Sequence, residues 1–430
     1  MPSGIEEIEV RNFKSFKELK VELGRFNVLI GPNASGKSNF VEIFRFLKNL
    51  TSYGLENAIS IEGGIEYLTN MRIRWSAPFY LKIVCAPEIP SFLPIKDNIG
   101  LNFKRVGYEF EVTFRDELSG SKIQISEERV RYWCEAYQIP NKKQLYVGSA
   151  EILVDRKGEK IACEIIKKEG EFPLSKEDVI RESYPDEKMR DFTLNKLMLG
   201  TPFVAAIILR PAFIFPLMEL SNIFEKASIH NLDPRLSRKA MPVSGKMDLE
   251  EDGSNLPIVL KHILAKREVK QRFLKLLRDI LPFVTDISVE KFADKFLFFK
   301  LKEKYFDDYI PASLVSDGTI NVISLLIPLY FGKSELIVLE EPDRSIHPAV
   351  ISKLVNFMDD ASTKKQVIIT THNPLIVKYV DIKNLFLVSR GKDGFSKICR
   401  AESKEDIKIF LENEIGIEEL YVQGLLSEGR

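Results

Sequence analysis

The first thirty residues alternate between polar and apolar positions in a way that predicts three strands. The segments IEEIEV and LKVEL follow a period of two, and FNVLI is a fully apolar run that leads into GPNASGKSN. After this glycine-rich turn, Phe40, Ile43, Phe44 and Leu47 recur at helical spacing. The pattern therefore predicts a strand, a glycine-rich turn and a helix in immediate succession.

The middle of the chain changes from a strand pattern to a helical one. The segments FYLKIVC, YEFEVTF, KIQI, LYVGSAEILV and KIACEII, with SG and KG turns between them, predict an antiparallel layer. From about residue 174 the period is helical, as in LPIVLKHILAKREVKQRFLKLLRDILP. We therefore predict an N-terminal lobe over 1–173, an inserted helical subdomain over 174–284 and a C-terminal lobe over 285–430.

The C-terminal lobe returns to strands that end in charged or polar turns. The apolar runs in SELIVLEEPD and KQVIITTHNP predict buried strands, and INVISLLIPLYFG predicts a helix. After Leu385 the pattern fits one strand pair and a short helix or two. Helices and apolar strands in this order predict an α/β fold.

Composition narrows the class of protein without identifying it. Apolar residues make up 45% and charged residues 29%, as in soluble globular proteins. Lys and Arg number 62 and Asp and Glu number 62, so any basic binding surface must be local. The four cysteines are far apart and show no C-x-x-C spacing, which argues against a zinc site and a disulfide framework.

We expect a cytoplasmic protein with no membrane segment. The N-terminus has no apolar run of signal-peptide length. The most apolar stretch, residues 202–220, is interrupted by Arg210, Pro211 and Pro216, so we expect a buried strand or helix joint there.

Residues 31–38 satisfy the phosphate-loop pattern G-x-x-x-x-G-K-[ST]. Loop N–H groups and the helix N-terminus would surround the phosphates, Lys37 would supply a charge at the β/γ oxygens, and Ser38 would offer its hydroxyl to Mg²⁺. The alternative, a glycine-rich turn without a ligand, is disfavoured by the position between strand and helix. We expect ATP contacts from Asn33, Ala34, Ser35, Gly36, Lys37, Ser38 and Asn39.

Two adjacent acids end the strand of residues 336–340. Neighbouring side chains at a strand end point in different directions, so two carboxylates can have two roles. We expect Glu340 to orient the Mg²⁺ shell with Ser38, and Glu341 to polarise the attacking water as general base. A buried strand followed by a solvated acidic turn is the alternative.

Two further motifs lie in the C-terminal lobe. Ser316 in SLVSDGT precedes the apolar helical run INVISLLIPLYFG, which suits either an ordinary helix cap or a phosphate site with Gly318 allowing close approach. His372 in TTHNP follows another apolar strand, and a structural histidine is the alternative to a site residue.

These motifs stand in the order found in ABC-type ATPases. GPNASGKSN, SLVSDGT, LIVLEEPD, SIHP and TTHNP most resemble the SMC/RecF/OLD branch, among the prokaryotic AAA-type ATPases with an SDGT signature and no appended nuclease domain. NFKSF near the start and DGSNL at 252–256 resemble the same group. The resemblance implies an ABC-type P-loop ATPase head: a mixed sheet with helices, an antiparallel β layer and an inserted helical subdomain.

The resemblance also implies roles for single residues. Ser316 and Gly318 would meet the γ-phosphate of ATP bound to another subunit, and His372 would sense it. Lys14, in NFKSF, would lie near the base or ribose, and residues 344–347 would cross the dimer interface. The catalytic set would be Glu341, Lys37 and His372.

This sequence departs from the ABC-type pattern at three places. Glu340 stands where transporter ATPases have Asp, and the signature does not end in Gly-Gln; both changes are usual in this branch. A glutamine that completes the Mg²⁺ shell has no clear counterpart, and Gln124 and Gln138 are the candidates.

The resemblance implies an ATP-dependent homodimer in which two chains clamp two ATP molecules head to tail. It would act in DNA maintenance or phage defence, and any nuclease or other effector would be a separate protein, because only 58 residues follow His372 (430 − 372). The alternative is the nucleotide-binding subunit of an ABC transporter, against which GKSN, Glu340 and the long insertion argue.

Support for DNA contact comes from one predicted helix. Near residues 266–280, the basic side chains fall broadly opposite the apolar ones, as they also do on an ordinary solvated helix face. The basic residues are Arg267, Arg272, Lys275 and Arg278, and the apolar ones are Val269, Phe273, Leu276 and Ile280.

Overall fold

The computed structural model describes residues 4–87, 93–96, 99–115, 122–139, 144–157, 160–183 and 211–403. Contacts divide the chain into two units. The β-layer unit comprises Met1–Gly24, Glu42–Lys226 and Arg390–Ile398, and the P-loop unit comprises Arg25–Val41, Ala227–Ser389 and Cys399–Arg430. This division follows contacts and not sequence order, so the three predicted ranges stay a prediction.

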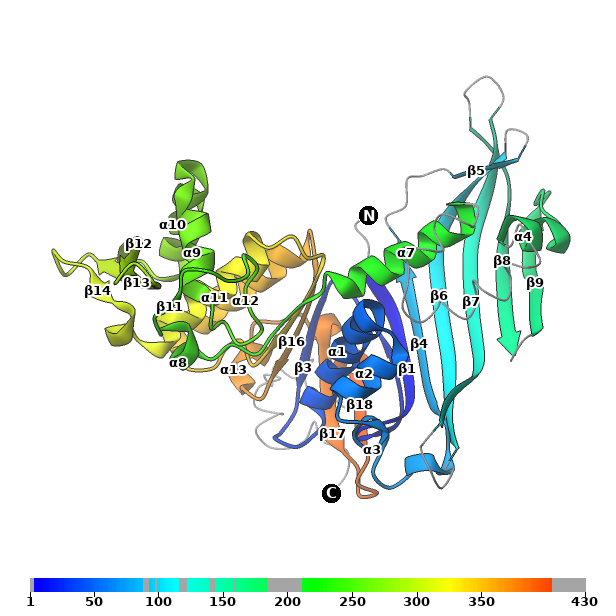
Figure 1. Ribbon diagram of the computed structural model, residues 1–430, viewed down its shortest axis with the longest axis horizontal. Helices are drawn as coiled ribbons and strands as arrows, with labels where there is room; N and C mark the ends of the chain where they lie inside the picture. The colour runs from blue at the N-terminus through cyan, green and yellow to red at the C-terminus, as the bar shows by residue number, and fades with distance from the viewer. Residues whose placement is uncertain are drawn as a thin grey trace, which may run out of the picture. The chain divides into compact units, whose positions relative to one another are not determined.

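An eight-stranded sheet forms the body of the β-layer unit, in the order β2-β1-β4-β6-β7-β8-β9, with β5 on β6 (Figure 1). All its recorded pairings are antiparallel, so the predicted antiparallel layer is confirmed. The strands are β1 (Gly4–Phe13), β2 (Phe16–Glu22), β4 (Phe79–Ala86), β5 (Leu93–Lys96), β6 (Ile99–Arg115), β7 (Lys122–Gln138), β8 (Leu145–Lys157) and β9 (Lys160–Gly170).

Aromatic side chains form the core of the β-layer unit. Phe46 of α1 (Lys37–Tyr53) lies edge-on to Phe79, with ring centroids 5.6 Å apart, and 6.4 Å from Phe13. Phe79 in turn lies edge-on to Phe110 at 5.9 Å. All four rings are fully buried. Offset and edge-on contacts of this kind add to the free energy gained by burying the rings.

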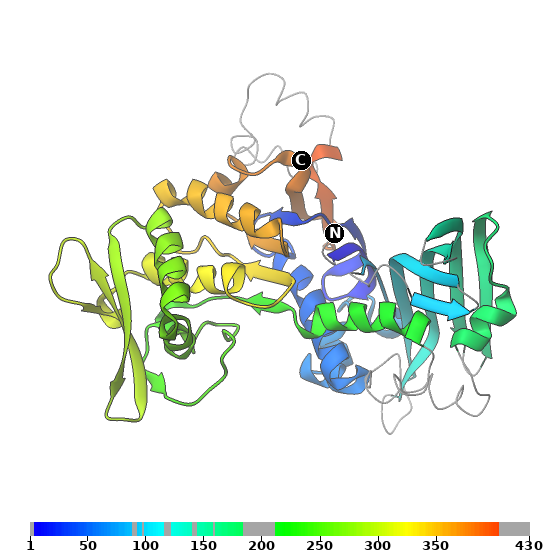
Figure 2. The same cartoon turned by 90° about the horizontal axis from the view of Figure 1, so that it is seen from above.

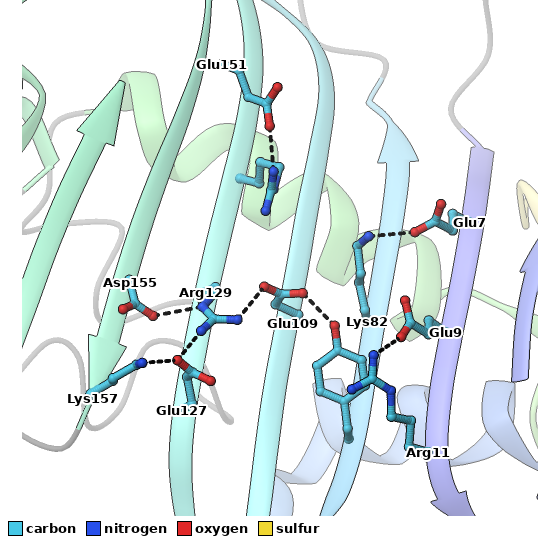
Figure 3. Close-up of polar contacts among 12 residues, drawn as sticks. Glu7, Glu9, Arg11, Lys82, Glu109, Glu127, Arg129, Glu151, Asp155 and Lys157 are labelled. Atoms are coloured by element: carbon cyan, nitrogen blue, oxygen red, sulfur yellow. Dashed lines mark hydrogen bonds and ion pairs between the residues drawn. The ribbon is translucent and has the colours of Figure 1, made fainter. Parts of the chain in front are cut away.

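Charged side chains cross-link neighbouring strands of the same sheet (Figure 3). Lys82 on β4 lies 2.7 Å from Glu7 on β1. Arg129 on β7 contacts Glu109 of β6 at 3.4 Å and Asp155 of β8 at 3.0 Å, and also pairs with Glu127. Opposite charges across strands stabilise their register. Cations in this network therefore have carboxylate partners.

The helices of the β-layer unit are short, apart from α1 and α7. Helix α7 packs on β5 and β6 and contains Pro216 (Figure 1). The described part of the apolar stretch 202–220 is therefore helix, and residues 202–210 lie outside the described residues. The helices are α2 (Leu55–Ile61), α3 (Ile65–Leu68), η1 (Arg74–Ser76), α4 (Lys176–Ser183) and α7 (Pro211–Glu225).

Among the described residues, no helix is long and apolar enough to cross a membrane.

The P-loop unit is built on a six-stranded sheet in the order β10-β15-β16-β3-β17-β18. The pairs from β10 to β17 are parallel, so the strands end at one edge of the sheet. Ile30 pairs with Thr371, and Glu340 pairs with Thr370. The strands are β3 (Phe26–Ile30), β10 (Ser228–His230), β15 (Leu336–Glu340), β16 (Gln366–Thr371), β17 (Leu385–Arg390) and β18 (Ser396–Arg400).

Helices cover the central strands of this sheet, which are mainly apolar and buried. Every residue of β3 and β16 is buried, as expected for parallel strands covered on both faces. The mixed α/β fold with a P-loop sheet and an antiparallel layer confirms the predicted fold class. The helices of this sheet's surroundings are α11 (Asp317–Tyr330), α12 (Pro348–Ser362), α13 (Pro374–Val377), η4 (Ile382–Asn384) and η5 (Ala401–Ser403).

A second core of the P-loop unit lies between α9, α10, α11 and a small sheet of order β11-β13-β12, with β14 on β13 (Figure 2). Phe273, Leu277 and Ile280 of α10 are buried, Val269 and Leu276 are half-buried, and Phe299 of β13 is fully buried. The remaining elements are α8 (Pro234–Ser237), β11 (Met241–Pro242), α9 (Leu256–Ala265), α10 (Arg267–Ile280), β12 (Val284–Phe292), β13 (Phe296–Glu303), β14 (Ile310–Pro311) and η3 (Ala312–Leu314).

We predict that Phe46→Ala lowers the free energy of unfolding by about 3–5 kcal/mol, because it leaves a cavity among Phe13, Phe79 and α1. Urea unfolding followed by fluorescence measures the change. Tyr53→Ala on the same helix is the control, since Tyr53 is 59% exposed and should cost far less. Equal losses for the two variants would contradict this account of the core.

Candidate functional site

The glycine-rich loop is tightly bound to the end of the P-loop sheet. It leaves β3 at Ile30 and enters α1 at Lys37, as the sequence predicts. A Cβ on Gly31 would lie 2.2 Å from the carbonyl oxygen of Val388, so only glycine fits there. Ala34 and Gly36 have φ values of 62° and 114°, which place the loop in a left-handed turn.

Lys37 is buried with carbonyl groups as its hydrogen-bond acceptors. Its Nζ donates to Gly31 O at 2.8 Å and to Pro32 O at 2.9 Å. Burial lowers the pKa of the Lys37 ammonium, and the carboxylates of Glu341 and Glu340 offset this only in part. An anion at the loop would stabilise this charge.

Ser35 supplies a second buried group that suits an incoming ligand. The residue is 2% exposed, and its hydroxyl has no hydrogen-bond partner in the part of the chain that the structure describes. A buried polar atom without a partner is costly, so a ligand that accepted or donated a hydrogen bond there would be favoured.

The two ends of the chain meet at Glu340. The hydroxyl of Ser38 donates a hydrogen bond to Oε1 of Glu340, which lies 302 positions further along the chain. Nδ2 of Asn231 donates to Oε2 of the same carboxylate at 3.3 Å. One hydroxyl, one carboxylate and one amide therefore lie at the shared edge of β3, β15 and β10.

The donor set fits magnesium bound together with a phosphate ligand. No group of three or more His, Cys, Asp or Glu side chains able to hold a metal occurs within the described ranges. Mg²⁺ is usually bound by one or two carboxylates together with substrate phosphates and water, not by an all-protein cage. Ser38 and Glu340 suit that mode of binding.

Glu341 is held in place by two neighbours. Nδ1 of His372 lies 2.8 Å from its Oε1, and Arg344 donates to its Oε2 at 3.0 Å. Burial acts to raise the pKa of Glu341, but the hydrogen bonds from Arg344 and His372 outweigh it and hold the pKa below its usual value. The side chain is therefore an ionised carboxylate, and its φ of 46° turns the chain sharply after β15.

Asp343 is a buried contact that the sequence analysis missed. Thr371, at the end of β16, donates to its Oδ1 at 2.9 Å. Burial raises the pKa of Asp343 despite hydrogen bonds from Thr371 and Asn373. The side chain joins the turn after Glu341 to the strand that ends before His372.

The SLVSDGT segment, residues 313–319, which we call the signature loop, leads into helix α11. The side chain of Ser316 is the N-cap and accepts a hydrogen bond from Thr319 N at 3.2 Å, so the cap interpretation is confirmed; it is compatible with a phosphate site. A Cβ on Gly318 would lie 2.5 Å from Ser345 O, so α11 packs closely on the turn after Glu341. Asn321 joins the same turn by donating to Pro342 O at 3.0 Å and to Arg344 O at 2.8 Å.

Lys14 lies in the β-layer unit, with its ammonium bound to carboxylates. Its Nζ is 2.7 Å from Glu62 and 3.4 Å from Glu42 of α1. Its backbone N–H donates to Leu68 O at 2.9 Å. A place near the base or ribose of the nucleotide stays a prediction for this residue.

Asn231 is the site residue that sequence reasoning did not find. Gln124 and Gln138, the two candidates for the missing amide, both lie on β7 of the β-layer unit. Strand β10 pairs in parallel with β15, with His230 opposite Leu339, so the next residue is level with Glu340. The only sequence signal is a polar residue after a strand of three residues, which is too short to recognise from its pattern.

The parallel sheet with the glycine-rich loop between β3 and α1 is a P-loop fold. Two family descriptions match the chain: "AAA ATPase domain" over residues 4–190, and "AAA domain, putative AbiEii toxin, Type IV TA system" over residues 231–378. The two matches therefore cover the ends where the phosphate loop, the paired acids and His372 occur.

Two curated proteins are similar to this chain. "Chromosome partition protein Smc" of Methanocaldococcus jannaschii is 41% identical over 69 residues, which are 16% of this chain and 6% of that protein. The match thus spans a small part of the Smc protein. "ATP/GTP phosphatase" of Helicobacter pylori is 20% identical over 428 residues, covering 95% of this chain and 98% of that protein.

Solved SMC heads are similar over most of their length. The "SMC head domain from Thermotoga maritima" is 12% identical with a TM-score of 0.41, covering 93% of this chain and 99% of that one. A Pyrococcus furiosus Smc head bound to the C-terminal domain of ScpA is 15% identical with a TM-score of 0.46, covering 96% and 100%.

We predict that Lys37→Met abolishes the rise in melting temperature that ATP and Mg²⁺ cause, while the ligand-free protein loses at most about 1 kcal/mol, because a buried charge with a lowered pKa contributes little to folding. Differential scanning fluorimetry with and without Mg-ATP measures both. Lys333→Met is the control, since Lys333 is exposed. A full ATP response in Lys37→Met would contradict the assignment of the loop.

Proposed function

We propose that this protein binds and hydrolyses ATP with Mg²⁺ and dimerises head to tail around the nucleotide. The observation that carries the proposal is the hydrogen bond between Ser38 and Glu340, which joins the phosphate loop to the paired acids across 302 positions. The name of the Helicobacter pylori relative, ATP/GTP phosphatase, supports hydrolysis as the reaction.

Different residues at the sheet edge would bind the phosphates and the metal. The N–H groups of residues 33–39 and the ammonium of Lys37 would bind the phosphates, with the N-terminus of α1 adding its dipole. Ser38 and Glu340 would hold Mg²⁺, directly or through water, and Asn231 would orient Glu340. The metal would neutralise charge on the phosphate oxygens during transfer.

Glu341 would act as the general base. The carboxylate is ionised, since its pKa is held down by Arg344 and His372, and an ionised carboxylate is the form that can accept a proton. Both of its oxygens already accept hydrogen bonds, one from each neighbour. A water molecule would have to replace one of these donors, and His372, 53% exposed in its side chain, is free to turn away. A positioned base is worth about 10²–10⁴ in rate.

The signature loop supports the dimer. Ser316 and the exposed Leu314, which is 75% accessible, present an N-terminal helix end and an apolar side chain at one surface. Arg344 on the adjoining turn is 46% exposed in its side chain. A sister subunit that brought its own ATP to this loop would cover Leu314 and place the γ-phosphate at Ser316 and Gly318.

We predict that Glu341→Gln lowers kcat about 10²–10⁴-fold and leaves an ATP-bound dimer that persists, because nucleotide binding remains while hydrolysis is lost. Analytical ultracentrifugation with Mg-ATP measures the dimer, and phosphate release measures kcat. Asp360→Asn, a change on α12 away from the paired acids, is the control. A Glu341→Gln protein that stays monomeric with bound ATP would contradict the clamp.

We further propose that the clamp acts in DNA maintenance or phage defence with a separate effector, such as a nuclease. The toxin–antitoxin wording of the family matched at 231–378 supports defence, and the Smc relative's name supports action on DNA. The transporter alternative would need a membrane-coupling partner subunit, and co-purification of such a subunit would favour it.

DNA contact has a local basis on α9 and α10. Lys261, Lys266, Arg267 and Lys275 are exposed and have no ion-pair partner among the described residues. The other Lys and Arg side chains of these helices are engaged. Lys270 pairs with Asp286, Arg272 lies over the ring of Phe331, and Arg278 donates to a backbone carbonyl. In a chain of zero net charge, this surface is therefore locally basic.

We predict that Arg267→Glu/Lys275→Glu lowers the slope of log K against log salt for duplex DNA by about two, since each lost phosphate contact removes about 0.9. Fluorescence anisotropy over a series of salt concentrations measures the slope. Lys17→Glu/Lys392→Glu makes the same change of charge at exposed positions of the β-layer unit and should leave the slope unchanged. Equal slopes for both double variants would show α10 to be an ordinary solvated face.

A further inference from the structure

Residues 231–238, which we call the bridging segment, connect the paired acids to the signature loop. At one end Asn231 donates to Oε2 of Glu340 at 3.3 Å. At the other end Nη2 of Arg238 forms an ion pair with Asp317 and donates to Val315 O at 3.3 Å. Eight residues therefore span the distance from the proposed metal carboxylate to both sides of Ser316.

The bridging segment has a defined internal structure. Asp233 caps α8, with its Oδ1 accepting from Arg235 N at 2.9 Å. The N–H groups of Leu236 and Ser237 both donate to Asp233 O, at 3.0 and 3.1 Å. Pro234 at the first helical position fixes φ where an N–H is not needed. A displacement of Asn231 would therefore shift Arg238 as well.

The DGSNL motif, residues 252–256, and Glu251 before it accept hydrogen bonds from the backbone of the bridging segment or pack on it. Asn231 N donates to Glu251 O at 2.9 Å, and Asp233 N donates to Asp252 O at 3.0 Å. Gly253 has a φ of +73°, and a Cβ there would lie 2.7 Å from Ser237 Oγ. Glycine is thus required both by the conformation and by the close approach.

Asn255 fixes the loop that precedes this motif. The side chain is 2% exposed. Its Oδ1 accepts from Glu250 N at 2.8 Å, and its Nδ2 donates to Asp248 O at 2.8 Å and Lys246 O at 3.2 Å. These bonds explain why an Asn stands in the motif: its amide closes the loop that supports the bridging segment.

Arg238 contacts the signature loop through one nitrogen only. Its Nε is buried and has no acceptor in the described part of the chain, so the guanidinium does not form a two-nitrogen contact through Nε. An exposed ion pair contributes little to stability, but this one is about one-third exposed and is joined by a bond to the backbone at Val315. Its position suits orientation of the loop more than stabilisation of the fold.

We propose that Arg238 is a positioning residue that sets the signature loop according to the state of Glu340, through the bridging segment. The inference rests on the proposed ATPase function and deepens it. When Glu340 engages metal, Asn231 follows its carboxylate, and Arg238 presents Ser316 and Gly318 to the sister subunit. Loss of Arg238 should therefore weaken the ATP-dependent dimer and leave ATP binding by the single chain unchanged.

The test compares four variants made in the Glu341→Gln background: Arg238→Gln, Arg238→Lys, Asp317→Asn and the pair Arg238→Gln/Asp317→Asn. Arg235→Gln is the matched control, because Arg235 lies on the same segment and is exposed. Fluorescent ATP-analogue binding at low protein concentration reports the single chain. Ultracentrifugation with Mg-ATP reports the dimer, and kcat and KM are measured with Glu341 intact.

We expect Arg238→Gln to weaken the dimer about tenfold and to lower kcat, with nucleotide affinity within about twofold of the parent, a coupling of ordinary size. Arg238→Lys should recover part of the loss, since one nitrogen makes both contacts. Asp317→Asn should weaken the dimer to a similar degree, and the double variant should be no worse than Arg238→Gln, as for two partners in one contact.

A dimer and a kcat equal to those of Arg235→Gln would overturn the inference. So would a loss of ATP binding and of melting temperature in parallel with the dimer, because that result would show a purely structural role. Failure of the parent protein to bind ATP at all would instead refute the proposed function. A parent that binds and hydrolyses ATP as a monomer would refute the clamp, and an unchanged kcat in Arg238→Gln would then refute the positioning role as well.

Discussion

Parallel pairing of β3, β16 and β15 is the constraint on which the site depends. Because the strands run the same way, their carboxyl ends share one edge, and turns from distant parts of the chain meet there. Backbone bonds fix this edge: Gly31 N donates to Thr371 O at 3.4 Å, and Glu341 N donates to Thr370 O at 2.9 Å. The hydroxyl of Ser38 therefore reaches Glu340, and the phosphate loop and paired acids form one site.

The site contains polar groups that would gain hydrogen-bond or charge partners if a ligand bound. Lys37 is buried against neutral carbonyl oxygens, and the Ser35 hydroxyl is buried without a partner among the described residues. Glu341 is held ionised by two donors beside it. The buried ammonium of Lys37 and the unpartnered hydroxyl of Ser35 lower the stability of the ligand-free protein and favour binding of an anion with its metal. The α/β scaffold, buried on both faces of its sheet, supplies the stability that these groups do not.

The sequence predicts those parts of this arrangement whose pattern lies within one short stretch of the chain. The strand, turn and helix around residues 26–53 follow from apolar periodicity and the glycine spacing, and β15 and β16 follow from apolar runs that end in polar turns. Asn231 could not be found, because it follows a three-residue strand and gains its position only from pairing with β15. Arg238 and Asp343 are likewise defined by partners remote in sequence, Asp317 and Thr371. The short helix or two predicted near the C-terminal end would fall among residues 404–430, which lie outside the described residues.

We propose that Ser38 and Glu340 belong to one metal site that also holds a nucleotide. The most direct measurement is a double-mutant cycle of Ser38→Ala and Glu340→Ala, with Mn²⁺ binding in the presence of ATP followed by electron paramagnetic resonance. We expect each single change to weaken Mn²⁺ binding and the two effects to be coupled, by roughly 0.5–3 kcal/mol, as for residues in contact. Strictly additive effects, or Mn²⁺ binding that neither change alters, would contradict this proposal.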